Sequence, residues 1–239
     1  MAYQAVFKRY ETKYLITLEQ KQRILEAMEP HMALDRYGRT TIRNIYFDTD
    51  NYRLIRRSIE KPVYKEKLRL RSYAQATPDS PVFVELKKKF KGIVYKRRLA
   101  MPEKLALDWI CHGGQTPEDT QIAREIDYFL HFYEGLKPTV FLSYDREAYY
   151  CRLGTDFRVT FDDTILCRQG DLSLELPPGG QAILPPGTVL MEIKCSGGIP
   201  LWMTRTLTQE RIYKTSFSKY GTAYQNLIFP KQKGDFQYA

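Results

Sequence analysis

The sequence lacks the motifs through which many enzymes bind nucleotides or metals. It has no G-x-x-x-x-G-K-[ST] loop, no G-x-G-x-x-G fingerprint and no H-E-x-x-H pair. Only three histidines are present, His31, His112 and His131, and none lies beside an obvious nucleophile. The stretch CHGG at residues 111–114 indicates a helix that ends in a glycine cap rather than an oxyanion loop. Any phosphate ligand is therefore expected to be bound by side chains.

Cysteine is also scarce. Cys111, Cys151, Cys167 and Cys195 form no C-x-x-C pair, which argues against a disulfide framework and against a zinc site. We expect reduced, mostly buried thiols.

Long apolar runs are absent as well. No run approaches the roughly 18 residues that span a bilayer, and the first residues, MAYQAVFKRYETKY, lack the apolar core of a secretory signal. We expect a cytoplasmic protein with no membrane segment in this chain. Its length of 239 residues suits a single domain, with a core from about residue 5 to residue 230.

Positive charge, in contrast, is abundant. The 37 lysines and arginines exceed the 28 aspartates and glutamates, so the net charge is +9. Such an excess favours a polyanionic partner. The candidates are nucleic acid, an anionic membrane surface and a phosphorylated small molecule, and charge alone does not choose between them.

Much of this charge lies in stretches with the alternation of a β-strand. In KLRLRSY, residues 67–73, Lys67, Arg69 and Arg71 share one face, while Leu68 and Leu70 share the other. Seven further stretches alternate in the same way: residues 9–16, 41–49, 82–89, 93–101, 140–149, 156–163 and 189–195. An antiparallel sheet with one wet face would also alternate, but an ordinary wet face mixes charges of both signs, and here basic residues predominate.

Eight strands suffice to close a barrel, and inward-facing cations would give it a basic tunnel. The predicted fold is therefore α+β, an antiparallel eight-stranded β-barrel that encloses a basic tunnel, with flanking α-helices. Helical periodicity, with Thr17 as a candidate N-cap, predicts four helices: Thr17–Met28, Pro102–Cys111, Glu118–Tyr133, and Leu201–Phe229 with a break near Ser216. The Pro- and Gly-rich segment Leu176–Thr188 is expected to connect two strands.

A tunnel of like charges needs carboxylates to offset their repulsion. Glu11, Glu85, Asp162 and Glu192 alternate with the cations and supply this compensation. Glu192, Glu11 and Asp162 are also candidate ligands for Mn²⁺ or Mg²⁺, because hard cations prefer carboxylate and phosphate oxygens.

The ordered motifs RYETKYLI, IYFDT, LRLRSY, VFVELKKK, SYDREAY, RVTFDDTI, MEIKCSGGIPLW and SFSKYGTAY resemble the catalytic domain of the vacuolar transporter chaperone (VTC) family. That family comprises polyphosphate polymerases among the triphosphate tunnel metalloenzymes. The resemblance implies an antiparallel barrel around a basic tunnel, and it spans roughly residues 5 to 230.

Carried over position by position, the resemblance implies two sets of site residues and a metal ligand, Glu192. The residues expected to act on the triphosphate are Arg69, Arg71, Lys87, Arg146, Arg158 and Lys194. The residues expected to bind substrate are Lys13, Lys96, Tyr144, Ser218 and Lys219. Arg98 joins the second set from the strand pattern, because it shares a face with Lys96.

The first strand bears on the reaction type. Hydrolytic members of the superfamily begin with E-x-E-x-K, whereas this sequence has Arg9 in place of the first glutamate, followed by Glu11 and Lys13. This pattern resembles the polymerase branch.

The function predicted from these features is transfer of the terminal phosphoryl group of ATP to phosphate, pyrophosphate or polyphosphate, with release of ADP. Phosphoryl transfer depends on charge neutralisation and positioning, and an ionised attacking phosphate needs no general base. One alternative is a metal-dependent inorganic or nucleoside triphosphatase. Another is a module that binds single-stranded RNA or another polyanion, but most tyrosines alternate with the cations as core residues, so no nucleic-acid partner is expected.

Overall fold

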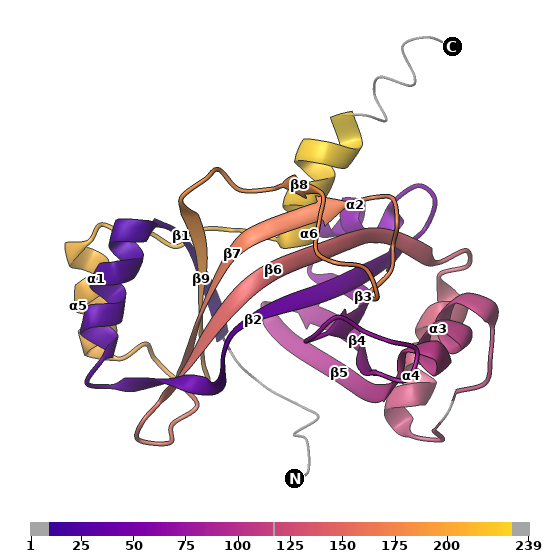
Figure 1. Cartoon of the computed structure of the whole chain (residues 1–239), viewed down its shortest axis with the longest axis horizontal. Helices are drawn as coiled ribbons and strands as arrows, with labels where there is room; N and C mark the ends of the chain where they lie inside the picture. The colour runs from indigo at the N-terminus through magenta and orange to yellow at the C-terminus, as the bar shows by residue number, and fades with distance from the viewer. Residues whose placement is uncertain (1–9, 117, 231–239) are drawn as a thin grey trace.

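An antiparallel β-sheet dominates the computed structural model, which describes residues 10–116 and 118–230 (Figure 1). Its strands are β1 (Tyr10–Thr17), β2 (Met32–Asp48), β3 (Tyr64–Ser72), β4 (Pro81–Phe90), β5 (Ile93–Pro102), β6 (Lys137–Cys151), β7 (Arg158–Arg168), β8 (Gln181–Ala182) and β9 (Thr188–Cys195). The order across the sheet is β1-β9-β7-β6-β2-β3-β4-β5, and the short β8 pairs with β7. The eight predicted strands are therefore present, and β8 lies within the predicted connection Leu176–Thr188.

The predicted closure of the barrel is wrong, because β1 and β5 stand at the two ends of the strand order and do not pair. The free edge of β1 is hydrogen-bonded to the segment before the C-terminal helix instead, where the Thr215 N–H donates to the Lys13 carbonyl at 2.7 Å. The sheet nevertheless curls on itself. Lys87 on β4 donates to Glu11 on β1 at 3.0 Å, although β4 is the seventh strand in the order and β1 the first. The result is a sheet with a concave inner face and an unpaired seam.

The helices largely follow the prediction. They are α1 (Leu18–Met28), α2 (Arg53–Ile59), α3 (Glu103–His112), α4 (Gln121–Phe132), α5 (Leu201–Gln209) and α6 (Lys219–Ala223), which continues into the π-helical turn η1 (Tyr224–Ile228). Thr17 and Gln20 form a capping box at the start of α1, and Gly113 ends α3 with a φ of 70°. The helix α2 was not predicted. Its N-terminus is capped from a distance, because the Asp48 carboxylate accepts from the backbone N–H groups of Leu54 and Ile55.

Two pairs of helices cover the outer face of the sheet (Figure 1). On one side α1 and α5 pack on β1, β9 and β7, through side chains such as Ile24 and Met203 against Met191. On the other side α3 and α4 pack on β3, β4 and β5, through side chains such as Trp109 and Phe129. These two clusters bury the apolar side of the alternating strands.

The inner face is divided between apolar and charged residues. Its apolar part, including Ile42 and Leu142, packs against α2, α6 and η1 through Ile55, Tyr220 and Tyr224. The remaining part of the inner face carries the charged residues, so the fold leaves them without a covering helix pair.

Two smaller predictions also bear on the fold. No disulfide joins any of Cys111, Cys151, Cys167 and Cys195 within the described residues, and the last two are buried. Across residues 10–116 and 118–230, no helix combines the length and the apolar character needed to cross a bilayer.

Candidate active site

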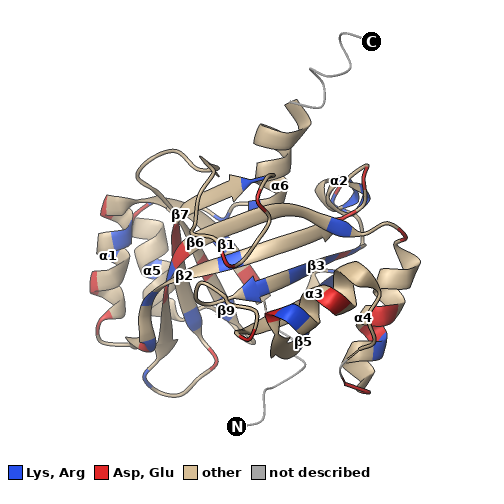
Figure 2. Cartoon of the chain, turned by 45° about the vertical axis from the view of Figure 1, so that its right-hand side comes forward, with Lys and Arg blue, Asp and Glu red and all other residues tan. Residues whose placement is uncertain are grey.

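The inner face gathers charged side chains from β1, β3 to β7, β9 and α6. Figure 2 marks the positions of charged residues along the ribbon. We call this set the charged interior. Its eleven basic members are Lys13, Lys67, Arg69, Arg71, Lys87, Lys96, Arg98, Arg146, Arg158, Lys194 and Lys219, and its four carboxylates are Glu11, Glu85, Asp162 and Glu192. Strand register places them on one side: Arg69 pairs with Glu85, and Glu192 pairs with Lys13.

Glu85 is the centre of the first cluster, which we call the Glu85 centre. Its side chain is fully buried and contacts Arg69 at 2.7 Å, Lys96 at 2.5 Å, Arg98 through Nε at 2.6 Å and Arg71 at 3.7 Å. Burial alone would raise the pKa of Glu85, but these four cations hold it well below its ordinary value. One carboxylate faces four cations, so this centre retains an excess of positive charge.

Neutral side chains orient the two arginines of this centre on β3. Arg71 donates through Nε to the Asn44 side-chain oxygen at 2.9 Å and through Nη2 to the Tyr144 hydroxyl at 3.0 Å. Arg69 donates through Nη1 to the Tyr46 hydroxyl at 3.0 Å. Asn44 and Tyr46 were not among the predicted site residues, although both lie on the inward-facing side of the predicted strand at residues 41–49.

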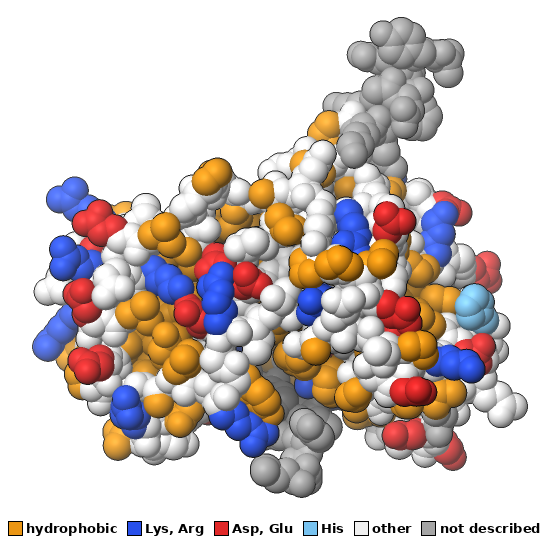
Figure 3. All heavy atoms as spheres, viewed as in Figure 1, with side chains coloured by type: hydrophobic (Ala, Val, Ile, Leu, Met, Phe, Trp, Pro, Cys, Tyr) orange, Lys and Arg blue, Asp and Glu red, His pale blue; other side chains and the backbone are white. Residues whose placement is uncertain are grey.

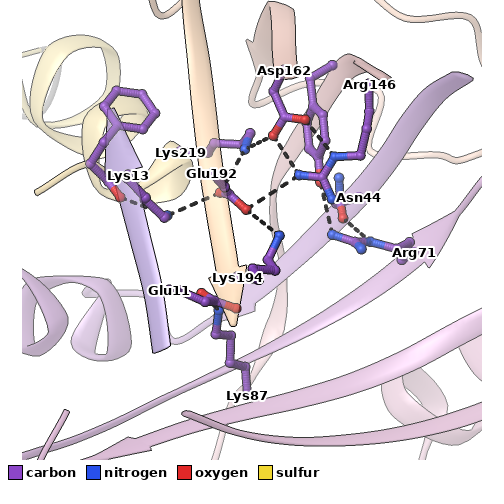
Figure 4. Close-up of polar contacts among 12 residues, drawn as sticks. Glu11, Lys13, Asn44, Arg71, Lys87, Arg146, Asp162, Glu192, Lys194 and Lys219 are labelled. Carbon is purple, nitrogen blue, oxygen red and sulfur yellow. Dashed lines mark hydrogen bonds and ion pairs between the residues drawn. The ribbon is translucent and has the colours of Figure 1, made fainter. Parts of the chain in front are cut away.

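Glu192 and Asp162 form the second cluster, which we call the Glu192 centre (Figure 4). Glu192 contacts Lys194 at 2.8 Å, Lys13 at 3.4 Å, Lys219 at 3.6 Å and Arg146 at 3.7 Å. Asp162, fully buried, accepts two hydrogen bonds from Arg146 at 2.6 Å each and one from Lys219 at 2.5 Å.

Burial and ion pairing act in opposite directions on these two carboxyl groups. Burial would raise the pKa of each, but the facing cations hold both values down, chiefly Lys194 and Lys13 for Glu192 and Arg146 and Lys219 for Asp162. Both groups are therefore carboxylates at neutral pH.

Tyr144 lies between the two centres. Its hydroxyl accepts from Arg71, and its ring lies 5.1 Å from the Arg146 guanidinium and 4.3 Å from the Lys219 ammonium. Burial would raise its pKa, but Arg71, Arg146 and Lys219 lower it to about 8. Cations from both centres therefore act on the Tyr144 hydroxyl.

Lys67 belongs to the charged interior but not to the set of residues carried over from the resemblance. Its ammonium donates to the Ser218 hydroxyl at 3.0 Å, and Ser218 in turn caps α6. Burial and the nearby Lys13, Lys65 and Lys87 lower the pKa of Lys67 to about 7. The alternation of KLRLRSY was the signal that placed it beside Arg69.

Two predicted residues lie toward the margins of the interior. Arg158 is exposed at the start of β7, in register with Lys194, and makes no ion pair within the described residues. Glu11 pairs with Lys87 across the seam; burial would raise its pKa, but Lys87 and Lys194 lower it to about 2. Arg9 lies outside the described residues.

The three candidate metal ligands do not form one cluster. Among residues 10–116 and 118–230, no three His, Cys, Asp or Glu side chains lie together as a metal site. Both oxygens of Asp162 are taken by Arg146, whereas the Glu192 side chain keeps 9% of its surface exposed. The donor set therefore suits a divalent cation that takes one carboxylate from the protein and its remaining oxygens from phosphate and water.

Comparison with known proteins agrees with this architecture. No curated protein matches the chain. A solved structure of a proposed adenylate cyclase from Bacillus halodurans is 15% identical, with a TM-score of 0.56, and the match covers 90% of this chain and 96% of that one. A proposed adenylyl cyclase from Hippeastrum, described as having a dominant triphosphatase activity, is 13% identical, with a TM-score of 0.56 and coverage of 92% and 95%.

At these identities the two structures show a shared fold, which is the triphosphate tunnel fold. The family is shown separately, because the model of the VTC domain family matches residues 8–228, nearly the whole chain. The chain belongs to the VTC domain family.

Proposed function

We propose that this protein is a metal-dependent phosphotransferase that moves the terminal phosphoryl group of ATP onto the end of an inorganic polyphosphate chain and releases ADP. One observation carries the proposal: within the charged interior, as far as the described residues show it, eleven basic side chains meet four carboxylates. Like charges repel strongly where water is scarce, so such an interior favours a ligand with several consecutive negative charges.

The proposed roles follow from the chemistry of each cation. Arg69, Arg71 and Arg98 present planar forks, which match the oxygens of a phosphate group. Lys87 and Lys194 act as compact point charges along the path of the phosphate chain. Transfer then depends on holding donor and acceptor phosphates in line and on neutralising their charge.

The absence of a catalytic histidine fits this reaction. The attacking group is the terminal phosphate of the acceptor, which is ionised near neutral pH and needs no base to activate it. The three histidines contribute no side chain to the charged interior.

A divalent cation, Mn²⁺ or Mg²⁺, would be held by Glu192 together with phosphate oxygens. It would supply neutralisation of the charge that develops on the departing ADP. Glu11 and Asp162 remain proposals as further ligands, and the double hydrogen bond from Arg146 makes Asp162 the weaker of the two.

Hydrolysis of a triphosphate is the second candidate function. The same cations would hold the substrate, and the Hippeastrum protein with this fold is described as having a dominant triphosphatase activity.

Binding of single-stranded nucleic acid is less well supported. On the face shown in Figure 3, basic and acidic side chains are mixed, without a continuous basic track. Nucleic-acid binding along an outer surface usually needs such a track, interleaved with exposed aromatic rings.

One assay separates the candidates: the purified protein is incubated with ATP and Mn²⁺ or Mg²⁺, and ADP, orthophosphate and gel-resolved polyphosphate are measured. Polyphosphate that lengthens with time, in step with ADP, supports the polymerase. Orthophosphate in step with ADP and no chain growth supports the triphosphatase, and the absence of both products contradicts both. Arg124→Gln, on the exposed face of α4, is the matched control for Arg69→Gln.

A further inference from the structure

Lys67 differs from the other buried cations of the charged interior, because no carboxylate lies within ion-pair distance of it among the described residues. Lys13 and Lys194 pair with Glu192, Lys87 pairs with Glu11, and Lys219 pairs with Asp162. The remaining buried cations pair in the same way with Glu85 or Asp162: Arg69, Arg71, Lys96, Arg98 and Arg146. Arg158 also lacks a carboxylate, but it is exposed to water.

The groups around Lys67 are neutral or positive. Its ammonium donates to the Ser218 hydroxyl at 3.0 Å and lies 5.8 Å from the centre of the Tyr220 ring. The charged groups that face it are Lys13 from β1, Lys87 from β4, and Lys65 and Arg69 from β3 itself. In such surroundings no opposite charge stabilises the ammonium form of the lysine until an anion binds.

We propose that Lys67 and the Ser218 hydroxyl form a subsite for one phosphate group of the substrate, where β1, β3, β4 and the start of α6 meet. The phosphate supplies the negative charge that no carboxylate supplies. The assignment rests on the proposed function in one respect: the phosphate belongs to the triphosphate or polyphosphate held by the charged interior.

The position of the subsite explains why it is needed. Lys67 shares a strand face with Arg69 of the Glu85 centre, two residues away, and lies close enough to Lys13 of the Glu192 centre for the charge of Lys13 to lower its pKa. A chain of phosphates that contacts both centres passes Lys67, and a carboxylate at this point would repel it. Lys67 is thus a positioning residue whose contribution appears only when the ligand is bound.

Filling the subsite is linked to uptake of a proton. The pKa of Lys67 is about 7 in the free protein, because of burial and the surrounding cations, and a bound phosphate raises it. Part of the population therefore gains a proton on binding at neutral pH, and affinity falls as the pH rises above 7. Lys96, whose pKa is also about 7, adds a second contribution, so the two lysines have to be separated by mutation.

The test is calorimetric titration of the full chain with tripolyphosphate, from about pH 7 to about pH 9, in two buffers of different protonation enthalpy. We expect Lys67→Met to weaken binding about 10- to 100-fold at pH 7, the loss typical of one charge-assisted hydrogen bond, and to lower proton uptake. Comparison with the wild type removes the titration of tripolyphosphate itself. Lys67→Arg should keep the affinity and lose the share of the pH dependence that Lys67 contributes, because arginine stays protonated.

Lys88→Met is the matched control, since Lys88 lies on β4 next to Lys87 but contacts Glu125 of α4 at 3.4 Å, outside the charged interior. It should change neither affinity nor proton uptake. If Lys67→Met binds tripolyphosphate with wild-type affinity and proton uptake while Arg69→Gln does not bind, the subsite is wrong and the proposed function stands. If the wild type itself does not bind, both are wrong.

Discussion

Both centres of the charged interior place carboxylates among a larger number of cations, but they use different residues. At the Glu85 centre one carboxylate faces four cations, and three of them are arginines. At the Glu192 centre two carboxylates face four cations, and three of them are lysines. The first centre keeps the larger excess of positive charge, and its arginines present donors in a fixed geometry. Both features suit the binding of phosphate. The second is closer to neutral, and its Glu192 side chain is buried but keeps 9% of its surface exposed, which suits a metal beside a phosphate.

The largest loss of stability is expected at the Glu85 centre, where one carboxylate balances four cations. Glu85→Gln leaves four buried cations without their shared carboxylate, and breaking a buried ion pair in this way costs about 3–5 kcal/mol of unfolding free energy. Urea unfolding measures the loss, and tripolyphosphate should restore part of it, because the anion replaces the missing charge.

Glu11→Gln is the matched control for that change, because Glu11 is partly exposed and pairs with Lys87 alone. It should cost less than Glu85→Gln. Equal unfolding midpoints for Glu85→Gln and the wild type would show that Glu85 does not hold the first centre together.

At the Glu192 centre the larger effect is expected on catalysis. Glu192→Gln should lower the rate about 100-fold and remove its dependence on manganese, since an amide is a poor ligand for a hard cation. Stability should fall less than in Glu85→Gln, because Asp162 still faces Arg146 and Lys219.

The rate measured against manganese concentration decides this prediction, with Asp163→Asn as the control, because Asp163 pairs with Arg39 outside the charged interior. If Glu192 only offsets the lysines, Glu192→Gln will lose stability and yet keep manganese-dependent turnover within a few fold of wild type.

A further effect is expected on the way in which the stability of the ligand-free protein depends on pH. Lys67 and Lys96 have pKa values of about 7 in the folded protein, against about 10.4 for an unfolded lysine. Between these values the unfolded chain binds more protons, so stability rises with pH above 7. The melting temperature should increase by several degrees, on the order of 10 °C, from pH 7 to about pH 9, and less in Lys67→Met. A melting temperature that falls equally in both proteins would contradict the assignment.

The smallest effect lies outside both centres, at Glu103 in the first turn of α3. Its side chain is buried, and burial together with nearby Glu175 raises its pKa to about 7. A raised carboxyl pKa gives stability that is full below pH 4.5 and is lost as the pH rises through 7. Glu103→Gln should flatten this decline in thermal unfolding.

Glu103→Gln also tests whether phosphate binding in the charged interior is independent of the region around α3. Tripolyphosphate binding by Glu103→Gln should equal that of the wild type in calorimetry. A loss of binding would mean that the surroundings of α3 are coupled to the phosphate site.

The alternation of the strands carried most of what could be predicted from the sequence. Period-two patterns identified the strands and their inward-facing residues, because one face of each strand had to be buried. The resemblance added Ser218 and Lys219, which lie beyond any strand. The helix α2 was missed because its cap, Asp48, lies before it at the end of β2.

What the sequence could not supply was the pairing between distant strands. Whether Glu11 meets Lys87 or another lysine depends on how far the sheet curls, and the seam beside β1 depends on Thr215 occupying its free edge. For the same reason the pattern placed Lys67 with the other cations. It could not show that Lys67 differs from the other buried cations of the charged interior in having no carboxylate within ion-pair distance among the described residues.

The most direct test of the central claim, that the charged interior holds a chain of phosphates across both centres, is a crystal structure with tripolyphosphate and Mn²⁺. The account predicts phosphate groups in contact with Arg69, Arg71 and Lys67, with an anomalous manganese signal beside Glu192. Phosphate bound only to exposed lysines on the outer surface, or manganese held away from Glu192, would contradict it.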